Sequence, residues 1–283
     1  MRNINWKTVL SFGNILKWVL ALAWLVISIF PIYWLFNVVF SPPGMAASLS
    51  PRLFPTSFSA GITKITQMAD TGSFLHAYVI TFYYAIVQIL GILIITSMAA
   101  YEFALFKFPG KDVLFIIAIS AMMVPQAVTL IPLFRMVSSF HWVNTIQGLA
   151  FPGMASALSL FIMRQYMEDI PKDLIDAASI DGASHLGTFR YVAIPLARNA
   201  MFTVGTLAFV FAWGNYLWPL LVSTSPNWYP VSVLTAGMSS AHTYNTIDQV
   251  IGAYFLASIP PVLVYIFLQR FIINSIALTG IKG

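Results

Sequence analysis

The chain has 283 residues, of which 59% are hydrophobic and only 8% are charged. Soluble domains carry about 25% charged residues, so this composition excludes an ordinary soluble fold and indicates that lipid is the solvent. The absence of cysteine excludes disulfides and thiolate metal sites. The net charge of +5 is typical of basic loops that flank membrane spans, which is a better explanation here than nucleic-acid binding.

Six apolar segments are long enough to cross a bilayer, since a transmembrane helix needs about 20 mostly apolar residues. The first follows Lys17 and runs without a charge from Trp18 to Phe40. It is longer than the apolar core of a signal peptide, about 7–15 residues, so we expect a retained anchor helix. The predicted spans are Trp18–Phe40, Tyr78–Tyr101, Val113–Phe134, Thr145–Met163, Ala200–Val222 and Val250–Leu268.

The basic residues predict the orientation of these spans. Six spans place both termini on one side, and cytoplasmic loops carry an excess of Lys and Arg. With the N-terminus inside, only Arg52, Lys64 and Arg135 lie outside. The basic residues inside are then Arg2, Lys7, Lys17, Lys107, Lys111, Arg164, Lys172, Arg190, Arg198, Arg270 and Lys282. The sequence therefore predicts an N-in, C-in topology in the cell membrane.

The chain is expected to divide into three parts. Residues 1–73 comprise the cytoplasmic start, the first span and an external loop, Ser41–Ser73, in which we expect short turns or an interfacial helix. Residues 74–273 form the transmembrane core, and residues 274–283 form a cytoplasmic tail.

One stretch of the core is unusually hydrophilic. Residues 164–198, here named the polar segment, hold nine of the 23 charged side chains (14 basic plus 9 acidic). A charge at the centre of a bilayer costs about 2.5–3.5 kcal/mol even on the mildest scale. The polar segment must therefore lie in water, and the orientation above places it in the cytoplasm.

Local signals within the polar segment predict two short helices. Asp169 is a candidate N-cap with Pro171 at the first helical position, and Gly182 can adopt the positive φ that ends a helix. Ser184 can cap a second helix that leads through Phe189, and Pro195 is expected to start the rise toward the fifth span. Taken alone, this pattern fits a docking helix or an ordinary interfacial amphipathic helix.

The polar segment resembles a motif of a known family. Asp176-Ala177-Ala178 followed by Asp181-Gly182-Ala183 is similar to the EAA loop of ABC importer permeases, and in particular to the second permease of maltose-type carbohydrate importers. Asp176 stands where this family usually has Glu. Further matching stretches are Phe189, Ile194–Leu196, Ala100-Tyr101, Lys107–Lys111, Met123–Pro125, Thr129–Leu133 and Gly280–Gly283.

The resemblance implies an all-α, type I ABC importer permease fold with a cytoplasmic coupling helix. It further implies a homologous second permease, an ATPase dimer that binds ATP and Mg, and an extracytoplasmic solute-binding protein that delivers a carbohydrate. This chain itself would hold no cofactor. The residues implied in ATPase coupling are Asp176, Ala177, Ala178, Asp181, Gly182 and Ala183, and a tail with Lys282 and Gly283 would reach toward the ATPase.

The residues also argue that the driving energy comes from outside the chain. Gly110-Lys111 is followed by Asp112 and preceded at the first-glycine position by Leu105, so no P-loop is present. The interiors of the predicted spans contain no Asp, Glu, Lys, Arg or His, which a proton relay would need. The four histidines, His76, His141, His185 and His242, show no metal-ligand spacing, and no catalytic pair is visible.

Neutral polar and aromatic residues inside the spans are candidates for a translocation cavity. Amides suit sugar hydroxyls and aromatic rings suit the apolar faces of sugars, although Trp and Tyr also mark membrane interfaces and amides also link helices. The cavity candidates are Gln88, Gln126, Trp213, Asn215 and Tyr216. A self-contained carrier or channel and a membrane-embedded enzyme are the alternative functions, and the identity of the sugar or polyol is left open.

Overall fold

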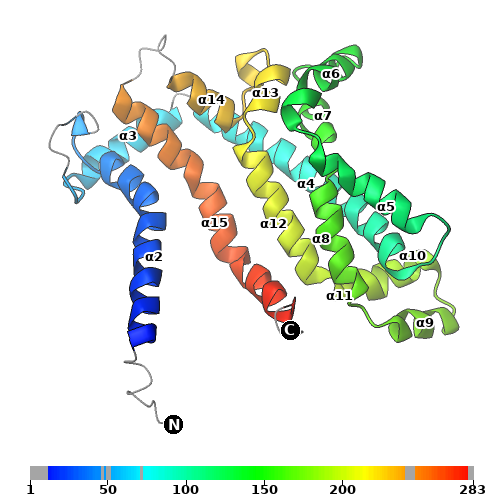
Figure 1. The fold of residues 1–283 in the computed structure, drawn as a ribbon. Coiled ribbons are helices and arrows are strands. Elements are labelled where there is room, and N and C mark those ends of the chain that lie inside the picture. Colours follow the sequence, from blue (N-terminus) through cyan, green and yellow to red (C-terminus); the bar gives the residue numbers. More distant parts are fainter. Residues whose placement is uncertain (1–11, 46–47, 49–51, 71–72, 240–245, 280–283) are drawn as a thin grey trace. The chain divides into compact units, whose positions relative to one another are not determined.

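The structure is a computed structural model that describes residues 12–45, 48, 52–70, 73–239 and 246–279, and every regular element in this part of the chain is helical (Figure 1). The chain forms two compact units. Unit 1 comprises residues 1–70 and 238–257, and unit 2 comprises residues 71–237 and 258–283. The last helix, α15 (Ile247–Thr279), contributes to both units.

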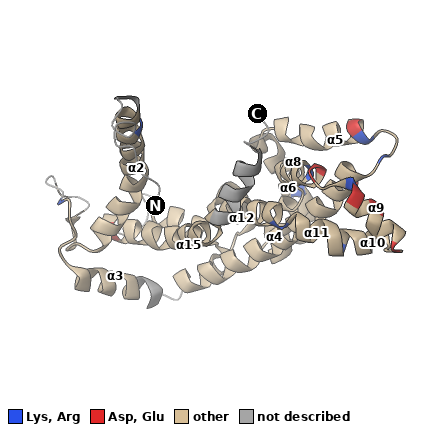
Figure 2. Ribbon diagram, turned by 90° about the horizontal axis from the view of Figure 1, so that it is seen from below, with Lys and Arg blue, Asp and Glu red and all other residues tan. Residues whose placement is uncertain are grey.

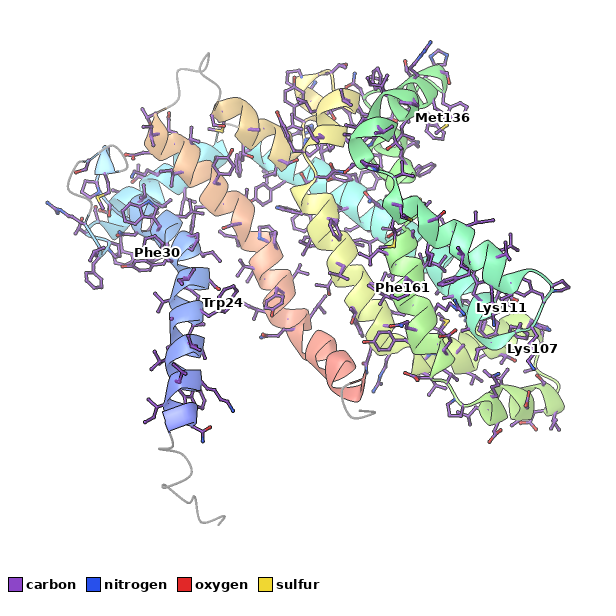
Figure 3. All side chains as sticks on the ribbon, viewed as in Figure 1. Trp24, Phe30, Lys107, Lys111, Met136 and Phe161 are labelled. Atoms are coloured by element: carbon purple, nitrogen blue, oxygen red, sulfur yellow. The ribbon has the colours of Figure 1, made fainter. Side chains whose placement is uncertain are left out.

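Unit 1 contains a long helix that is apolar on every side. This helix, α2 (Phe12–Val39), has 28 residues, and Trp24 and Phe30 project from it into the surroundings (Figure 3). A helix that is hydrophobic all round and uncovered by protein is suited to lipid. The predicted external loop holds a further helix, α3 (Phe58–Asp70), where short turns or an interfacial helix were expected.

An ion pair ties the elements of unit 1 together. Lys64 on α3 lies 3.8 Å from the Asp248 carboxylate at the start of α15, and both side chains are largely buried. The Lys64 ammonium also donates to the carbonyls of Val38 (3.3 Å) and Ser41 (2.9 Å) at the end of α2. The backbone N–H of Gly44 donates to the same Asp248 carboxylate. Because breaking a buried pair leaves one charge uncompensated, these contacts hold the three elements in one arrangement.

Unit 2 is built around α4 (Ser73–Leu105), which packs against α8 (Ala157–Glu168) and α12 (Arg198–Gly214). One apolar core lies where these helices meet α5 (Lys111–Ser120), and Met163 and Met167 are fully buried in it. A second core surrounds Tyr84, whose hydroxyl donates to the carbonyl of Ala212. Small residues such as Ala200 and Ala208 let α12 approach its neighbours closely.

Several helices of unit 2 are interrupted. α5 continues through η2 (Ala121–Met123) into α6 (Gln126–Ser139) with a bend of 99°, and α7 (Ile146–Ala150) with η3 (Phe151–Gly153) meets α8 at 50°. α12 ends at Gly214 and is followed by α13 (Leu217–Val222). The remaining connections include η5 (Pro226–Trp228) and α14 (Val231–Met238).

These interruptions correct the predicted spans. Three helices of the described chain are long and apolar enough to cross a membrane alone, and bent pairs raise the number to as many as six. The predicted segments Val113–Phe134, Thr145–Met163 and Ala200–Val222 are therefore not single helices. At the first break the cause is Pro125, because a residue that precedes proline is driven to extended backbone, and Val124 has φ −83° and ψ 116°.

Candidate functional site

The polar segment folds into a chain of short helices between α8 and α12. These are α9 (Lys172–Ile180), α10 (His185–Thr188), the π-helical turn η4 (Phe189–Ala193) and α11 (Ile194–Leu196). Figure 2 shows charged residues of unit 2 gathered here and around the start of α5. The helix from 185 to 196 meets α12 at 77°, so the polar segment turns sharply before the fifth predicted span.

The start of α9 differs from the prediction. Asp169 does not cap it but forms the C-cap of α8, and Pro171 is the N-cap rather than the first helical residue. The reason is the extended backbone of Pro171 (φ −58°, ψ 126°), whose carbonyl accepts from the Leu174 N–H at 3.2 Å. Pro195 likewise lies inside α11, and α12 begins only at Arg198.

The end of α9 and the start of α10 confirm the predicted signals. Gly182 has a φ of +81°, which L side chains rarely adopt. The N–H of Ala183 donates to Ala178 at 2.9 Å and that of Gly182 to Ser179 at 3.1 Å, which is the Schellman arrangement. The Ser184 hydroxyl then accepts from the Gly187 N–H at 3.2 Å. The two helices are therefore joined by a defined turn.

Buried side chains and aromatic rings fasten the polar segment to the end of α4. Ile175 of α9 is buried in the core that contains Tyr101. The ring of Tyr101 meets Phe189 at 5.2 Å between centroids, and the ring of Phe106 meets His185 at 4.8 Å. Aromatic pairs add about 0.5–1.5 kcal/mol each beyond their area burial. These contacts join α9 and α10 to the end of α4.

Arg164 fixes the other end of the polar segment. Its guanidinium lies 2.9 Å from the Glu168 carboxylate, one helical turn away. The same group sits 3.8 Å from the centroid of the Phe115 ring on α5, a cation–π distance. Arg164 thus joins α8 to α5 at the start of the polar segment.

The opposite face of α9 and α10 is uncovered. Ile180 is 86% exposed and Leu186 67% exposed, although both are large apolar side chains. Asp176 and Ala177 are also exposed on α9, and no ion pair of the Asp176 carboxylate is found among the residues that the structure describes. A small-residue helix face with one acid and adjoining apolar side chains is suited to contact another protein.

Three of the five predicted cavity residues line one pocket, here named the amide pocket. Gln88 comes from α4, Gln126 from the start of α6, and Asn215 from the break after α12. The other lining residues are Thr129, Leu130, Leu133, Leu149, Pro152, Gly153 and Trp218. The broken helices therefore converge on the pocket, as irregular backbone in membrane proteins does where it borders a cavity.

The amide pocket is neutral, and its polar groups are partly unengaged. Gln88 Nε2 donates weakly to the carbonyl of Gly153 at 3.4 Å. Within the described residues, no hydrogen bond involves the side-chain amides of Gln126 or Asn215. The pocket has a volume of about 80 Å³, far below the roughly 300–1,000 Å³ of ordinary ligand sites. In this conformation the amide pocket is therefore too small to hold a sugar.

Trp213 and Tyr216 do not line this pocket. Trp213 is buried among aromatic rings, with Phe82 at 4.8 Å and Tyr78 at 5.5 Å between centroids. Trp218 takes the place at the pocket, and its indole N–H donates to the carbonyl of Gly148 at 3.0 Å. The sequence could not separate the two tryptophans, because the turn at Asn215 decides which of them faces inward.

Some contacts at the polar segment had almost no signal in the sequence. The aromatic contacts of Tyr101 and His185 were not predicted, and the Ala100-Tyr101 stretch was their only sequence signal.

The predicted tail residues Lys282 and Gly283 lie outside the described residues. No group of three or more His, Asp or Glu side chains that could hold a metal ion occurs in residues 12–45, 48, 52–70, 73–239 and 246–279.

Comparison with known proteins identifies the family. Residues 91–277 match the family described as "Binding-protein-dependent transport system inner membrane component", and this range contains the whole polar segment. The chain belongs to this family. It is accordingly a transport permease component, and its apolar helices are those of a multi-pass protein of the inner membrane.

Similar proteins of this inner membrane family include transporters of several solutes. The arabinooligosaccharide transport permease AraQ of Bacillus subtilis is 30% identical over 68% of this chain and 68% of its own length. The sn-glycerol-3-phosphate transport permease UgpE of Salmonella typhi is 30% identical over 72% of this chain and 70% of its own length. AraQ of Halalkalibacterium halodurans is 25% identical over 95% of this chain and 98% of its own length.

A solved structure has the same fold. The chain matches a crystal structure of a bacterial ABC transporter involved in the import of the acidic polysaccharide alginate, with a TM-score of 0.81 and 22% identity. The match covers 92% of this chain and 95% of the other. The predicted all-α ABC importer permease fold is thereby confirmed.

Proposed function

We propose that this chain is a permease subunit of an ATP-driven carbohydrate importer. It would pair with a homologous second permease, receive solute from an extracytoplasmic solute-binding protein, and be moved by an ATPase dimer that binds ATP and Mg. The family and the names of the relatives support a transport role. The lack of a P-loop and of ionisable residues within the predicted spans supports a separate source of energy.

The observation that carries this proposal is the uncovered face of the polar segment. Ile180 and Leu186 are exposed while Ile175 on the other side of α9 is buried in unit 2. Burying one large apolar side chain is worth about 1.5–3 kcal/mol, so this face is suited to a protein partner. The ATPase is the partner that the resemblance implies, with Asp176 and the small residues Ala177 and Ala178 at the contact.

The helix α4 can connect the ATPase contact to the solute. Tyr101 near its C-terminal end packs against Phe189 of the polar segment, and Gln88 on the same helix lines the amide pocket. Tyr101 and Gln88 are 13 positions apart on this helix, which is about 20 Å at 1.5 Å per residue. A push on α9 would therefore shift the wall of the pocket as a rigid body, which is how packed helices transmit motion.

The composition of the amide pocket supports a neutral solute. Gln88, Gln126 and Asn215 offer donors and acceptors for hydroxyl groups, and Trp218 offers an indole ring. No charged side chain lines the pocket, whereas an anionic solute such as a glycerophosphate would favour a cation. Its small volume supports a pathway that is completed by the second permease.

The test is coupling in the assembled complex, reconstituted in lipid vesicles with its ATPase and solute-binding protein. Asp176→Arg places a cation on the proposed contact face and should abolish most solute-stimulated ATP hydrolysis and uptake. Asp176→Glu keeps the charge and the family's usual residue, so it should retain both activities. Unchanged stimulated hydrolysis in an intact Asp176→Arg complex would refute the coupling role.

A further inference from the structure

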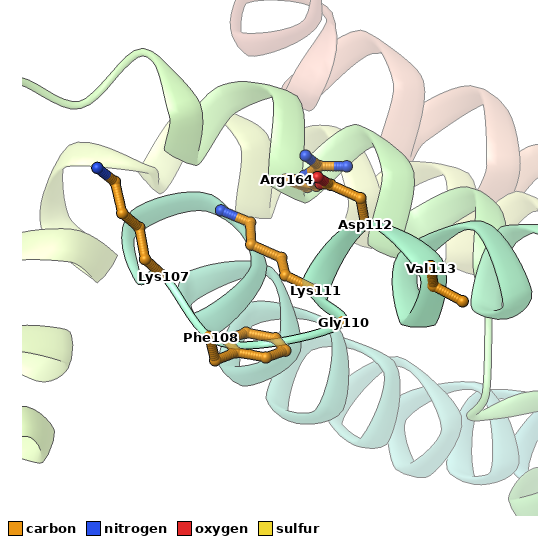
Figure 4. A pocket seen from close by; sticks show the side chains of 7 residues that line it. All are labelled: Lys107, Phe108, Gly110, Lys111, Asp112, Val113 and Arg164. Atoms are coloured by element: carbon orange, nitrogen blue, oxygen red, sulfur yellow. The ribbon is translucent and has the colours of Figure 1, made fainter.

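A second pocket of unit 2, here named the basic pocket, is unrelated to the amide pocket. It lies between the α4–α5 loop, the first turn of α5 and α8, and it has a volume of about 490 Å³ (Figure 4). Its lining residues are Lys107, Phe108, Gly110, Lys111, Asp112, Val113 and Arg164. Neither the coupling contact nor the solute pathway uses this pocket.

The charge around the basic pocket favours an anion. Lys107 projects from the loop, Lys111 from the first turn of α5 and Arg164 from α8, whereas Asp112 is the single acidic lining residue (Figure 4). If Glu168, the partner of Arg164, is also counted, three cations face two carboxylates. One negative charge would therefore balance the site.

Two side-chain donors at this site have no acceptor within the described chain. Lys111 donates to the carbonyl of Phe106 at 3.0 Å, but no partner of the Lys107 ammonium is found among the described residues. The Nε of Arg164 likewise lacks a described acceptor, but this atom is shielded from solvent. A free Lys donor beside a cavity fits phosphate oxygens.

The start of α5 adds backbone donors to these side chains. Gly110, with φ +77°, is the N-cap of this ten-residue helix, and no side chain caps it. In the part of the chain that the structure describes, no acceptor is found for the backbone N–H groups of Asp112 and Val113. The N-terminus of a helix carries a partial positive charge and is favourable for phosphate.

An exposed apolar face continues directly from the basic pocket along α5. Val113, Ile116 and Ile117 recur at helical spacing, and each is more than half exposed, while Phe115 is turned into the core. Phosphate donors at one end of a helix and an uncovered apolar face along it match the two parts of a phospholipid. A free phosphate would use only the first part.

We propose that the basic pocket binds the phosphate-containing headgroup of an anionic phospholipid whose acyl chains lie along α5. The predicted N-in orientation places residues 107–111 at the cytoplasmic leaflet, where anionic lipids gather and where basic pockets between helices bind such headgroups. The bound lipid would fill the space between α5 and α8 and stabilise the packing of Arg164, at the start of the polar segment, against α5.

The test is photo-crosslinking in nanodiscs that contain the whole transporter complex and a photoactivatable phosphatidylglycerol diluted in phosphatidylcholine. Mass spectrometry measures the labelled fraction of the peptide that spans residues 107–117. Lys107→Gln should lower labelling about fivefold, since a basic residue near an anionic lipid surface contributes about 1 kcal/mol. Lys107→Arg should restore labelling. Lys17→Gln, which removes an exposed cation from α2 in unit 1, should leave it unchanged.

Four results would overturn the proposal. Absence of labelling at residues 107–117 would mean that another protein covers this face. Equal labelling by photoactivatable phosphatidylcholine would exclude headgroup selection. An equal loss in Lys17→Gln would indicate only general surface charge. Competition by excess soluble glycerophosphoglycerol would assign the site to a free phosphate ester. None of these readouts depends on solute transport, so they are independent of the proposed function.

Discussion

The polar segment and the amide pocket are both polar regions of an apolar chain, but they are built in opposite ways. The polar segment concentrates formal charges, leaves Asp176 and Ile180 exposed, and is made of consecutive residues. The amide pocket has no charge and is assembled from three separated parts of the chain, at Gln88, Gln126 and Asn215. Under the proposed function, charge is kept where the chain meets its ATPase in water, and neutral amides are kept where the solute crosses the membrane.

The strongest way to break this comparison is to move a charge into the amide pocket. Gln126→Arg should lower solute uptake by about a hundredfold, because a charge within the bilayer region costs about 2.5–3.5 kcal/mol. Uptake by vesicles with equal amounts of assembled complex is the measurement. Gln165→Arg makes the same change at an exposed position of α8 and should alter uptake only slightly. Equal losses in both variants would contradict the comparison.

The exposed apolar side chains of the polar segment provide the next test. Ile180→Ser should weaken association with the ATPase by roughly tenfold or more, since burial of one large apolar side chain contributes about 1.5–3 kcal/mol. Titration of the purified ATPase onto nanodisc-bound permease measures this affinity. The matched control is Phe54→Ser, which removes a side chain of similar exposure from the external loop of unit 1. An unchanged affinity in Ile180→Ser would exclude this face as the contact.

The turn after α9 separates backbone geometry from side-chain contacts. A Cβ atom at Gly182 would meet nothing within 4 Å of this chain, so within the chain the strain of a substitution comes from the φ of +81°. Gly182→Ile should cost about 1–2 kcal/mol and lower coupled ATP hydrolysis several-fold, whereas Gly182→Asn should be milder because Asn tolerates this conformation. Gly44→Ile imposes the same strain in unit 1, where Gly44 also has a free space around it and a φ of +85°. A loss of coupling in Gly44→Ile equal to that in Gly182→Ile would attribute the effect to general instability.

The smallest expected effect concerns the wall of the amide pocket. A methyl group at Gly153 would lie 2.3 Å from Gln88 Nε2, so Gly153→Ala must displace the Gln88 side chain. Loss of one hydrogen bond costs about 0.5–1.5 kcal/mol, so uptake should fall a few-fold while ATPase binding is unchanged. Gly205→Ala on α12, where the nearest side-chain atoms lie at 3.9 Å and 4.0 Å, is the control and should have no effect. An altered ATPase affinity in Gly153→Ala would show that the two regions are not separable.

The two regions also differ in how well the sequence predicts them. Local chemistry defined the polar segment: Gly182 ends α9 and Ser184 caps α10, because both signals act within a few residues. The helix starts were less accurate, since the choice between Asp169 and Pro171 depends on where the preceding helix stops. The aromatic contacts of Tyr101 with Phe189 were beyond prediction, because they join residues far apart in the chain.

The sequence by itself determined that the chain is a membrane protein, that its fold is all-α, and that the polar segment spans residues 164–198. Composition and charge are sums over residues, and helix caps are local, so neither depends on how distant helices meet. Only the tertiary structure decided that Trp218 rather than Trp213 borders the amide pocket, that Gln88, Gln126 and Asn215 meet there, and that Arg164 reaches Phe115. The first two outcomes depend on the chain breaks at Pro125 and Asn215, and the third on the packing of α8 against α5, so none can be derived from the identity of one residue.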